Sequence, residues 1–182
     1  VEGDLSAIAG GPAFLRAVLL SDEVFLISAE DLVASFYLVR MPFSWHRWFS
    51  FEKSVSSESV GLPPGRRVRI CAVVLPMGFT SATGFMQAWH RSVVLRSAPL
   101  VPAGGWAERG LDANLEVRND RPFPLSASTR PRSGWSIYID DLLDISILRR
   151  QAMLSQLGVV GRHQSMVRGT YAGEGIPCNL PK

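Results

Sequence analysis

The sequence predicts an α/β (α+β) fold, in which one antiparallel sheet has helices packed on one face. The length of 182 residues fits a single domain. With 47% hydrophobic and 19% charged residues, the chain can bury a core, which excludes a disordered segment. The predicted elements run strand, strand, helix, hairpin, helix, and this order favours a sheet covered by helices.

Three segments predict the strands. Residues 23–32, EVFLISAEDL, are apolar and partly β-branched, which indicates a buried strand that ends in acids. Residues 66–75, RRVRICAVVL, alternate at first and then become wholly apolar, as in a strand that enters a core. Residues 135–148, WSIYIDDLLDISIL, predict two short strands with two adjacent acids at the turn between them.

Two segments predict helices. After a capping Thr80 or Ser81, apolar residues recur at helical spacing, namely Ala82, Phe85, Met86, Trp89 and Val93. Polar residues fall mainly on the other side of this helix, namely Gln87, His90 and Arg91. Residues 162–175 predict a final helix despite their glycines.

Two segments predict irregular structure. Residues 54–65 are rich in Ser, Gly and Pro, which indicates a surface loop. Residues 97–134 also carry much Pro, Gly and Ser and show no sustained period, so we expect a long, loop-rich insertion.

Charge and cysteine content set broad limits on function. The formal net charge of +3 permits nucleic-acid binding without requiring it. Cys71 and Cys178 lie far apart without a CxxC partner, so neither a disulfide framework nor a zinc site is expected. We therefore expect an intracellular protein, cytoplasmic or nuclear. No apolar run reaches the ~18 residues that span a bilayer, so no membrane partner is expected.

The adjacent acids Asp140 and Asp141 indicate a metal site. Two carboxylates ~4 Å apart repel each other by several kcal/mol at low effective dielectric unless a cation lies between them. Mg²⁺ takes one or two carboxylates together with substrate phosphates, and two such ions ~3.5–4 Å apart catalyse phosphoryl and nucleotidyl transfer. Such a site needs a further acid at a strand end, and Asp31 is the obvious candidate.

Four segments match, in order, the segments of one known family. Tyr138-Ile139-Asp140-Asp141 looks like a Tyr-X-Asp-Asp box, and residues 31–36, DLVASF, place an aromatic residue five positions after an Asp. Residues 75–79, LPMGF, look like a Leu-Pro-Gln-Gly-aromatic segment, and residues 175–182, GIPCNLPK, end in a lysine. These segments resemble the palm of the reverse transcriptases of retroviruses and retrotransposons.

The resemblance implies a role for each matching acid. Asp31 and Asp140 would bridge two metal ions, and Asp141 would be the third and least indispensable acid. The carbonyl of Leu32 would complete one metal's shell. Lys182 would protonate the departing pyrophosphate as a general acid. The implied cofactor is a pair of Mg²⁺ ions, with Mn²⁺ as an alternative.

The resemblance also implies a nucleotide site. Phe36 would lie under the incoming sugar and exclude a 2′-hydroxyl, and Gly78 would let the backbone approach the nucleotide. Tyr138 would lie near the primer end. Met77 stands where the family has a Gln that contacts the nucleotide, so that contact is lost; by itself Met77 is interpreted as a pocket-lining or core residue.

The implied function is that of an RNA-directed DNA polymerase, a nucleotidyltransferase that adds deoxynucleotides to a primer on an RNA or DNA template. Residues 1–22 would be a remnant of the fingers or a linker, and residues 23–182 the palm with partial fingers and an insertion at about 97–134. Fingers, thumb and ribonuclease H would belong to a longer polyprotein, so we expect this chain alone to be poorly active or inactive. Arg16 is the only basic residue ahead of Asp31, and thus the only candidate for holding the triphosphate.

Other interpretations remain open. The acid pair can be simply the turn of a hairpin, because Asp favours turns. The chain can be a retroelement remnant that folds and binds nucleic acid without catalysis. An RNA-directed RNA polymerase shares the metal chemistry, but Tyr138 and Phe36 argue against it.

Some aromatic residues can stack on bases or pack on the sheet, and packing is favoured for Trp45, Trp48 and Phe49. The three arginines of 66–69 fit a phosphate-facing stripe or a solvated strand edge equally well, and the histidines receive no role.

Overall fold

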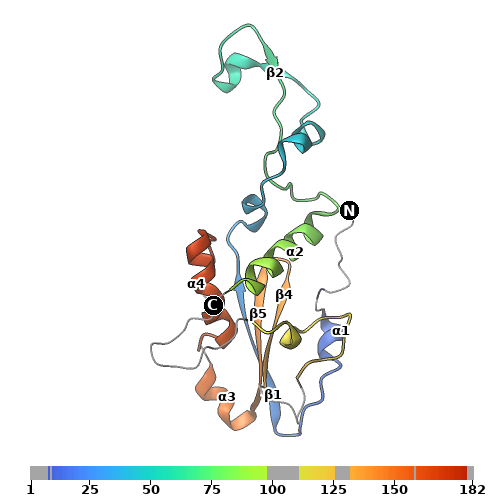
Figure 1. The fold of residues 1–182 in the computed structure, drawn as a ribbon, viewed down its shortest axis with the longest axis vertical. Coiled ribbons are helices and arrows are strands. Elements are labelled where there is room, and N and C mark those ends of the chain that lie inside the picture. Colours follow the sequence, from blue (N-terminus) through green and yellow to red (C-terminus); the bar gives the residue numbers. More distant parts are fainter. Residues whose placement is uncertain (1–7, 9, 98–110, 126–131, 158, 180–182) are drawn as a thin grey trace. The chain divides into compact units, whose positions relative to one another are not determined.

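The computed structural model describes residues 8, 10–97, 111–125, 132–157 and 159–179. These form two compact units, one of residues 1–33 with 83–182 and the other of residues 34–82 (Figure 1). The fold combines helices with antiparallel strands, so the predicted mixed class is confirmed.

A three-stranded antiparallel sheet forms the centre of the first unit. Its strands are β1 (Glu23–Asp31), β4 (Ser133–Tyr138) and β5 (Asp141–Arg149), in the order β1-β5-β4. The predicted first strand and the predicted hairpin are therefore confirmed. The central β5 is rich in Leu and Ile, as expected for a strand that has hydrogen-bonded neighbours on both sides.

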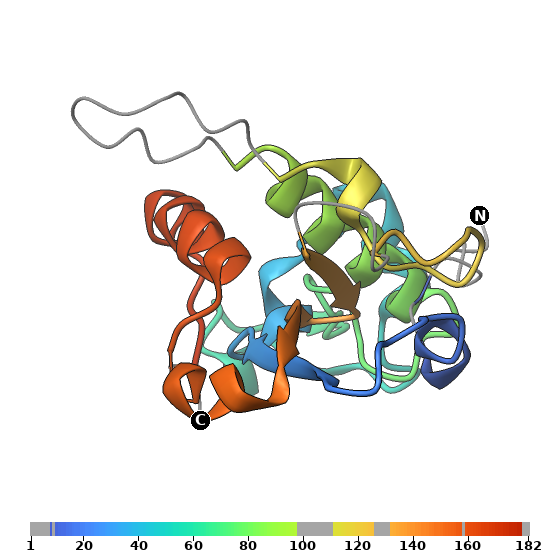
Figure 2. The ribbon, with the colours of Figure 1, turned by 90° about the horizontal axis from the view of Figure 1, so that it is seen from below.

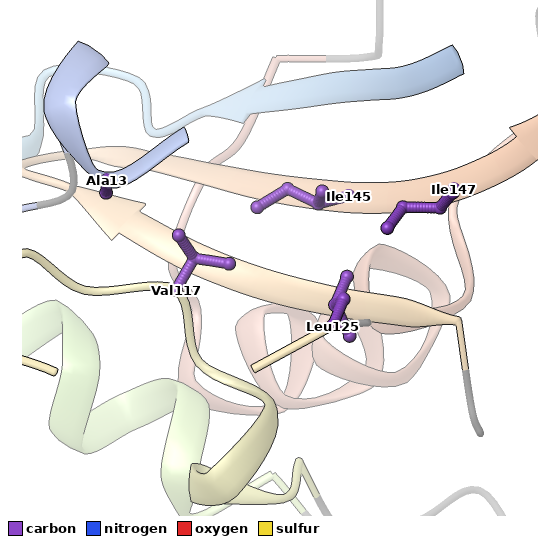
Figure 3. Close-up of a cluster of buried hydrophobic side chains, with 5 residues drawn as sticks. All are labelled: Ala13, Val117, Leu125, Ile145 and Ile147. Carbon is purple, nitrogen blue, oxygen red and sulfur yellow. The ribbon is translucent and has the colours of Figure 1, made fainter. Parts of the chain in front are cut away.

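One face of the sheet carries the hydrophobic core cluster shown in Figure 3. Ile145 and Ile147 point to this face because alternate residues of a strand share a side. Ala13 joins them from α1 (Gly11–Phe14), and Val117 and Leu125 join them from the segment between α2 and β4. Within the loop-rich insertion predicted for 97–134, residues 111–125 supply part of the core.

The other face of the sheet meets α4 (Arg162–Glu174). Ser28 on β1 donates a hydrogen bond to Gln164 of this helix (3.0 Å). The expectation that the helices share one face is wrong for α1, which lies on the side opposite α4 (Figure 2). The predicted helices at 80–93 and 162–175 are found as α2 (Ala82–Leu95) and α4, whereas α3 (Arg150–Gln156) was not expected.

The sheet caps the first turn of α4. The Asp144 carboxylate on β5 accepts hydrogen bonds from the backbone N–H groups of His163 (2.6 Å) and Gln164 (3.3 Å). A carboxylate at this position satisfies otherwise unpaired donors and interacts favourably with the helix dipole. Gly161 lies against it so closely that an added Cβ would stand 2.3 Å from the carboxyl carbon of Asp144. Glycine is therefore required at this position.

The second unit is an antiparallel ribbon of chain with short helical turns. Its strands are β2 (Val55–Ser56) and β3 (Arg67–Val68), and its 3-10 turns are η1 (Ser35–Leu38), η2 (Phe43–Phe49) and η3 (Ser57–Val60). A further 3-10 turn, η4 (Ala113–Leu115), belongs to the first unit. The predicted surface loop at 54–65 contains β2 and η3.

The strand predicted for residues 66–75 is wrong. Only Arg67–Val68 form a regular strand, followed by isolated pairs of Cys71 with Ser50 and of Val74 with Arg40. Ile70 and Val73 remain about half exposed, and in this run only the terminal Leu75 is buried. Its apolar composition misled the prediction because its partner segment is interrupted by η2.

Among the helices that the structure describes, none combines the length and the apolar character needed to cross a bilayer.

The contact between Gly161 and Asp144 predicts the effect of a small substitution. Gly161→Ala should lower the free energy of unfolding by about 1–3 kcal/mol, because its methyl group displaces the capping carboxylate. Gly173→Ala is the matched control in the same helix, where nothing lies within 4 Å of the added Cβ. It should raise stability by about 0.5–1 kcal/mol. Urea unfolding of both variants measures this, and equal effects of the two would contradict the role given to Gly161.

Candidate functional site

Three acids gather at one end of the sheet. Asp31 ends β1 and Asp141 begins β5, and the two are direct partners in the antiparallel ladder. Side chains in such pairs have their Cβ atoms about 5 Å apart. Asp140 lies in the turn just before, where its carbonyl accepts a hydrogen bond from the backbone N–H of Leu32 (3.2 Å). Residues more than a hundred positions apart in the chain thus meet at this edge.

The acids influence each other electrostatically. Burial raises the pKa of the Asp141 carboxyl above its ordinary value, and the negative charges of Asp140 and Asp31 raise it further. Both causes disfavour the charged form of Asp141. A bound cation would relieve the repulsion, so the charge distribution of this edge favours cation binding.

The donor types fit a hard divalent ion, although the arrangement is not closed around one. Mg²⁺ prefers carboxylate oxygens and completes its octahedron with waters and substrate phosphates. Within the described ranges, no three His, Cys, Asp or Glu side chains stand close enough together to hold a metal. The side-chain amide of Asn179 donates to one oxygen of Asp31 (2.9 Å). An ion that used this oxygen would have to replace the amide.

The turn that carries the acids has an unusual backbone. Ile139 has a φ of 58°, in the left-handed region that β-branched residues rarely adopt. Such a conformation costs on the order of 1–3 kcal/mol and persists only where the surroundings enforce it. Gln87 of α2 supplies part of this enforcement, because its side chain accepts from the Ile139 N–H (2.6 Å) and donates to the Ile137 carbonyl (2.9 Å).

His90 lies one turn further along α2 and contacts the same turn. Its Nδ1 is 3.1 Å from the carbonyl oxygen of Ile139, and its Nε2 is 2.5 Å from the hydroxyl of Tyr171 on α4. The side chain is fully buried, and burial lowers its pKa to about 4. Gln87 and His90, predicted on the side of the helix away from its apolar residues, are therefore both buried. Their spacing of three residues puts both polar groups on one helix face but does not reveal that this face is buried.

A second buried contact holds the strand that carries Asp31. Glu30 has only 1% of its surface exposed, and its carboxylate accepts from Arg168 of α4 at 3.0 and 3.1 Å. Cys178 lies beside it, and burial together with a hydrogen bond to Glu30 raises the pKa of the thiol. The segment around Cys178 also pairs with the chain after β1, because the Val33 N–H donates to the Pro177 carbonyl (2.9 Å).

The remaining predicted residues of this unit have varied surroundings. Leu32 is buried beside Asp31. Tyr138 is partly exposed and lies on β4, where it pairs with Asp141 of β5. Asp31 pairs with Asp141 from β1, on the other side of β5. Lys182 lies outside the described residues. The guanidinium of Arg16 donates to the carbonyls of Asn119 (2.7 Å) and Arg121 (3.1 Å), which ties it to the segment before β4.

Three predicted nucleotide-site residues belong to the unit of residues 34–82. Phe36 lies half-buried in η1. Met77 has 72% of its surface exposed, so the interpretation of it as a core residue is wrong. Gly78 has a φ of 90°, which glycine adopts without strain.

The same unit exposes aromatic rings beside positive charge. Phe43 is 87% exposed and Trp48 is 71% exposed, and the guanidinium of Arg47 stacks 4.7 Å from the centre of the Trp48 ring. Phe49 meets the ring of Phe79 edge-on at 5.1 Å, which is not the predicted packing on the sheet, and the exposed Trp48 contradicts that prediction. Residues 34–82 carry six Lys and Arg residues against two Glu and no Asp. We call Phe43, Arg47 and Trp48 the aromatic surface.

Comparison of the chain with protein-family models and with curated proteins finds no match in either case. Its functional interpretation therefore depends on its own residues.

The burial of His90 predicts how stability responds to acid. Its pKa is about 4 in the folded chain and near 6.5 when unfolded, so between these values only the unfolded state takes up the proton. The free energy of unfolding should fall as the pH drops through this window, by on the order of 3 kcal/mol in total. Urea unfolding at several pH values measures the loss.

His90→Gln is the informative variant for this acid response, since it removes the titrating group, and its stability should depend less on pH. His163→Gln, which alters another buried histidine and leaves His90 intact, should keep the part of the dependence that His90 supplies. Equal pH dependence in the wild-type chain and in His90→Gln would refute the assignment.

Proposed function

We propose that the chain is the palm of a reverse transcriptase, which extends a primer with deoxynucleotides on an RNA or DNA template. The observation that carries this proposal is the pairing of Asp31 with Asp141, next to Asp140. The order of the matching sequence segments, from Asp31 through residues 75–79 to Tyr138, supports it further.

The acids would act as ligands of divalent ions. A bound pair of Mg²⁺ ions supplies Lewis-acid stabilisation of the charge that develops in nucleotidyl transfer. Asp31 and Asp140 would supply shared oxygens, Asp141 a further one, and the Leu32 carbonyl would complete a shell. Tyr138 flanks Asp141 in the ladder, and this place fits a contact with the primer end.

The resemblance also assigns nucleotide contacts to residues of the unit 34–82. Phe36 would exclude a 2′-hydroxyl from the incoming sugar, and Gly78 would allow the backbone to approach the nucleotide. Met77 cannot supply an amide contact, so its exposed thioether would give only apolar contact with the nucleotide. Lys182 would protonate the leaving pyrophosphate.

Substitution of the acids tests the proposal. Asp31→Asn or Asp140→Asn should each lower primer extension by at least about 100-fold in the enzyme that contains this sequence, because each removes a charged ligand. Asp22→Asn is the matched control, since Asp22 lies just before β1, at the opposite end from Asp31, and pairs with Arg149. Extension assays with a radiolabelled primer measure the rates. Full activity in either acid variant would exclude the proposed role.

A second candidate is a non-catalytic protein that binds single-stranded nucleic acid, and the aromatic surface favours it. Exposed rings offer stacking platforms for bases, and nearby guanidinium groups attract phosphates. The positive excess of residues 34–82 agrees with such a partner. Binding without catalysis would also accommodate Met77, which lacks the family's amide.

Single-strand binding is tested by substitution in the aromatic surface. Trp48→Ala should weaken the binding of a fluorescent oligonucleotide by about tenfold, because one base loses its stacking partner. Leu154→Ala, a similarly exposed apolar residue of α3, should leave binding unchanged. Fluorescence anisotropy at fixed salt measures both. Equal affinities of these two variants would argue against the aromatic surface, and binding without any primer extension would favour the second candidate.

A further inference from the structure

Two contacts connect the turn to α4 through His90. The imidazole lies between the Ile139 carbonyl, at 3.1 Å from Nδ1, and the Tyr171 hydroxyl, at 2.5 Å from Nε2. Both His90 and Tyr171 have no exposed surface. Water therefore cannot replace either contact at low cost.

The chemistry of the partners fixes the direction of both hydrogen bonds. A carbonyl oxygen only accepts, so the Nδ1 of His90 carries a proton and donates to Ile139. The Nε2 of a neutral imidazole is then an acceptor. The Tyr171 hydroxyl consequently donates to Nε2, and this bond selects the tautomer that holds the turn.

We propose that His90, oriented by Tyr171, is a positioning residue that sets the direction of the Asp140 carboxylate. The inference depends on the proposed function, in which Asp140 is a metal ligand. The carbonyl that His90 holds belongs to the peptide between Ile139 and Asp140, so a rotation of this peptide would turn the backbone that carries the carboxylate.

The neighbouring contacts make this role specific. Gln87 fixes the peptide before Ile139 through the Ile139 N–H, whereas His90 fixes the peptide after it. The same helix that holds His90 through Tyr171 also holds Glu30 through Arg168. Because Glu30 precedes Asp31, α4 is connected to the chain neighbours of both acids. This arrangement fixes the two acids relative to each other.

Two replacements of His90 separate positioning from simple filling of space. In His90→Asn the new side-chain amide nitrogen can reach the place of Nδ1 and keep the bond to Ile139. In His90→Gln the amide nitrogen reaches the place of Nε2, so the bond to the turn is lost although the volume is closer to that of His. If His90 positions the turn, the protection of the Ile139 amide in His90→Asn should be closer to that of the wild-type chain than in His90→Gln. If His90 only fills space, His90→Gln should be the closer of the two.

Hydrogen exchange of the Ile139 amide measures the turn without requiring catalysis. In NMR spectra of this chain, His90→Gln should lower the protection of this amide by about tenfold, because the turn opens more often. His90→Asn should keep protection within about threefold of wild type. His163→Gln, remote from the turn, is the control and should not change it.

Kinetics in the enzyme that contains this sequence provide the second measurement. His90→Gln should lower kcat for primer extension by about 10- to 100-fold while changing the KM for the nucleotide by less than about threefold. Tyr171→Phe should show a smaller fall in kcat, because the tautomer is no longer selected. If His90 had only a structural role, its substitution would lower the free energy of unfolding without lowering kcat selectively relative to the KM for the nucleotide.

The outcomes distinguish this inference from the proposed function. If the exchange results are as expected but the wild-type enzyme extends no primer, positioning of the turn stands and the polymerase proposal is wrong. If Ile139 protection is unchanged in His90→Gln, or falls equally in His90→Asn, the positioning role is overturned.

Discussion

The register between β1 and β5 is the constraint on which the candidate site depends. It places Asp31 directly opposite Asp141 at the last pair of the ladder. Because side chains alternate along a strand, a slip of one residue would send one acid to the other face of the sheet. The same register brings Phe25, which packs against the core cluster, opposite Ile147, so the hydrophobic core helps to specify the geometry of the acids.

Gathering three acids and forcing Ile139 into a left-handed conformation are both unfavourable, and α4 helps to offset these costs. Asp144 anchors its first turn to β5, and Arg168 and Tyr171 connect its later turns to the neighbours of the acids. These buried contacts are directional, so they fix orientation as well as distance. Strain and like charge held by a rigid surround are typical of functional sites, although a two-residue hairpin turn also places its first central residue at positive φ.

Much of the first unit could be predicted from the sequence, because its signals are local. β-branched runs predict β1 and the hairpin, helical spacing predicts α2, and α4 is also found where a helix was expected. Gln87 and His90 could not be predicted as buried, since a polar side chain on a helix is normally solvated unless a distant backbone offers it partners. The meeting of Asp31 with the acid pair was expected because a two-metal site needs a further acid at a strand end, and the resemblance strengthened this expectation; periodicity did not reveal it. The apolar run at 66–75 misled the prediction because apolar composition reports a tendency to be buried and does not reveal whether a covering partner exists.

The central claim is that the three acids together hold a divalent cation, and Mn²⁺ binding measured by electron paramagnetic resonance tests it most directly. Titration of the wild-type chain should show bound Mn²⁺ that Mg²⁺ displaces, and the double variant Asp31→Asn/Asp140→Asn should show none at the same concentrations. If the double variant binds Mn²⁺ as well as the wild-type chain does, or if the wild-type chain binds none at millimolar concentration, the claim is contradicted.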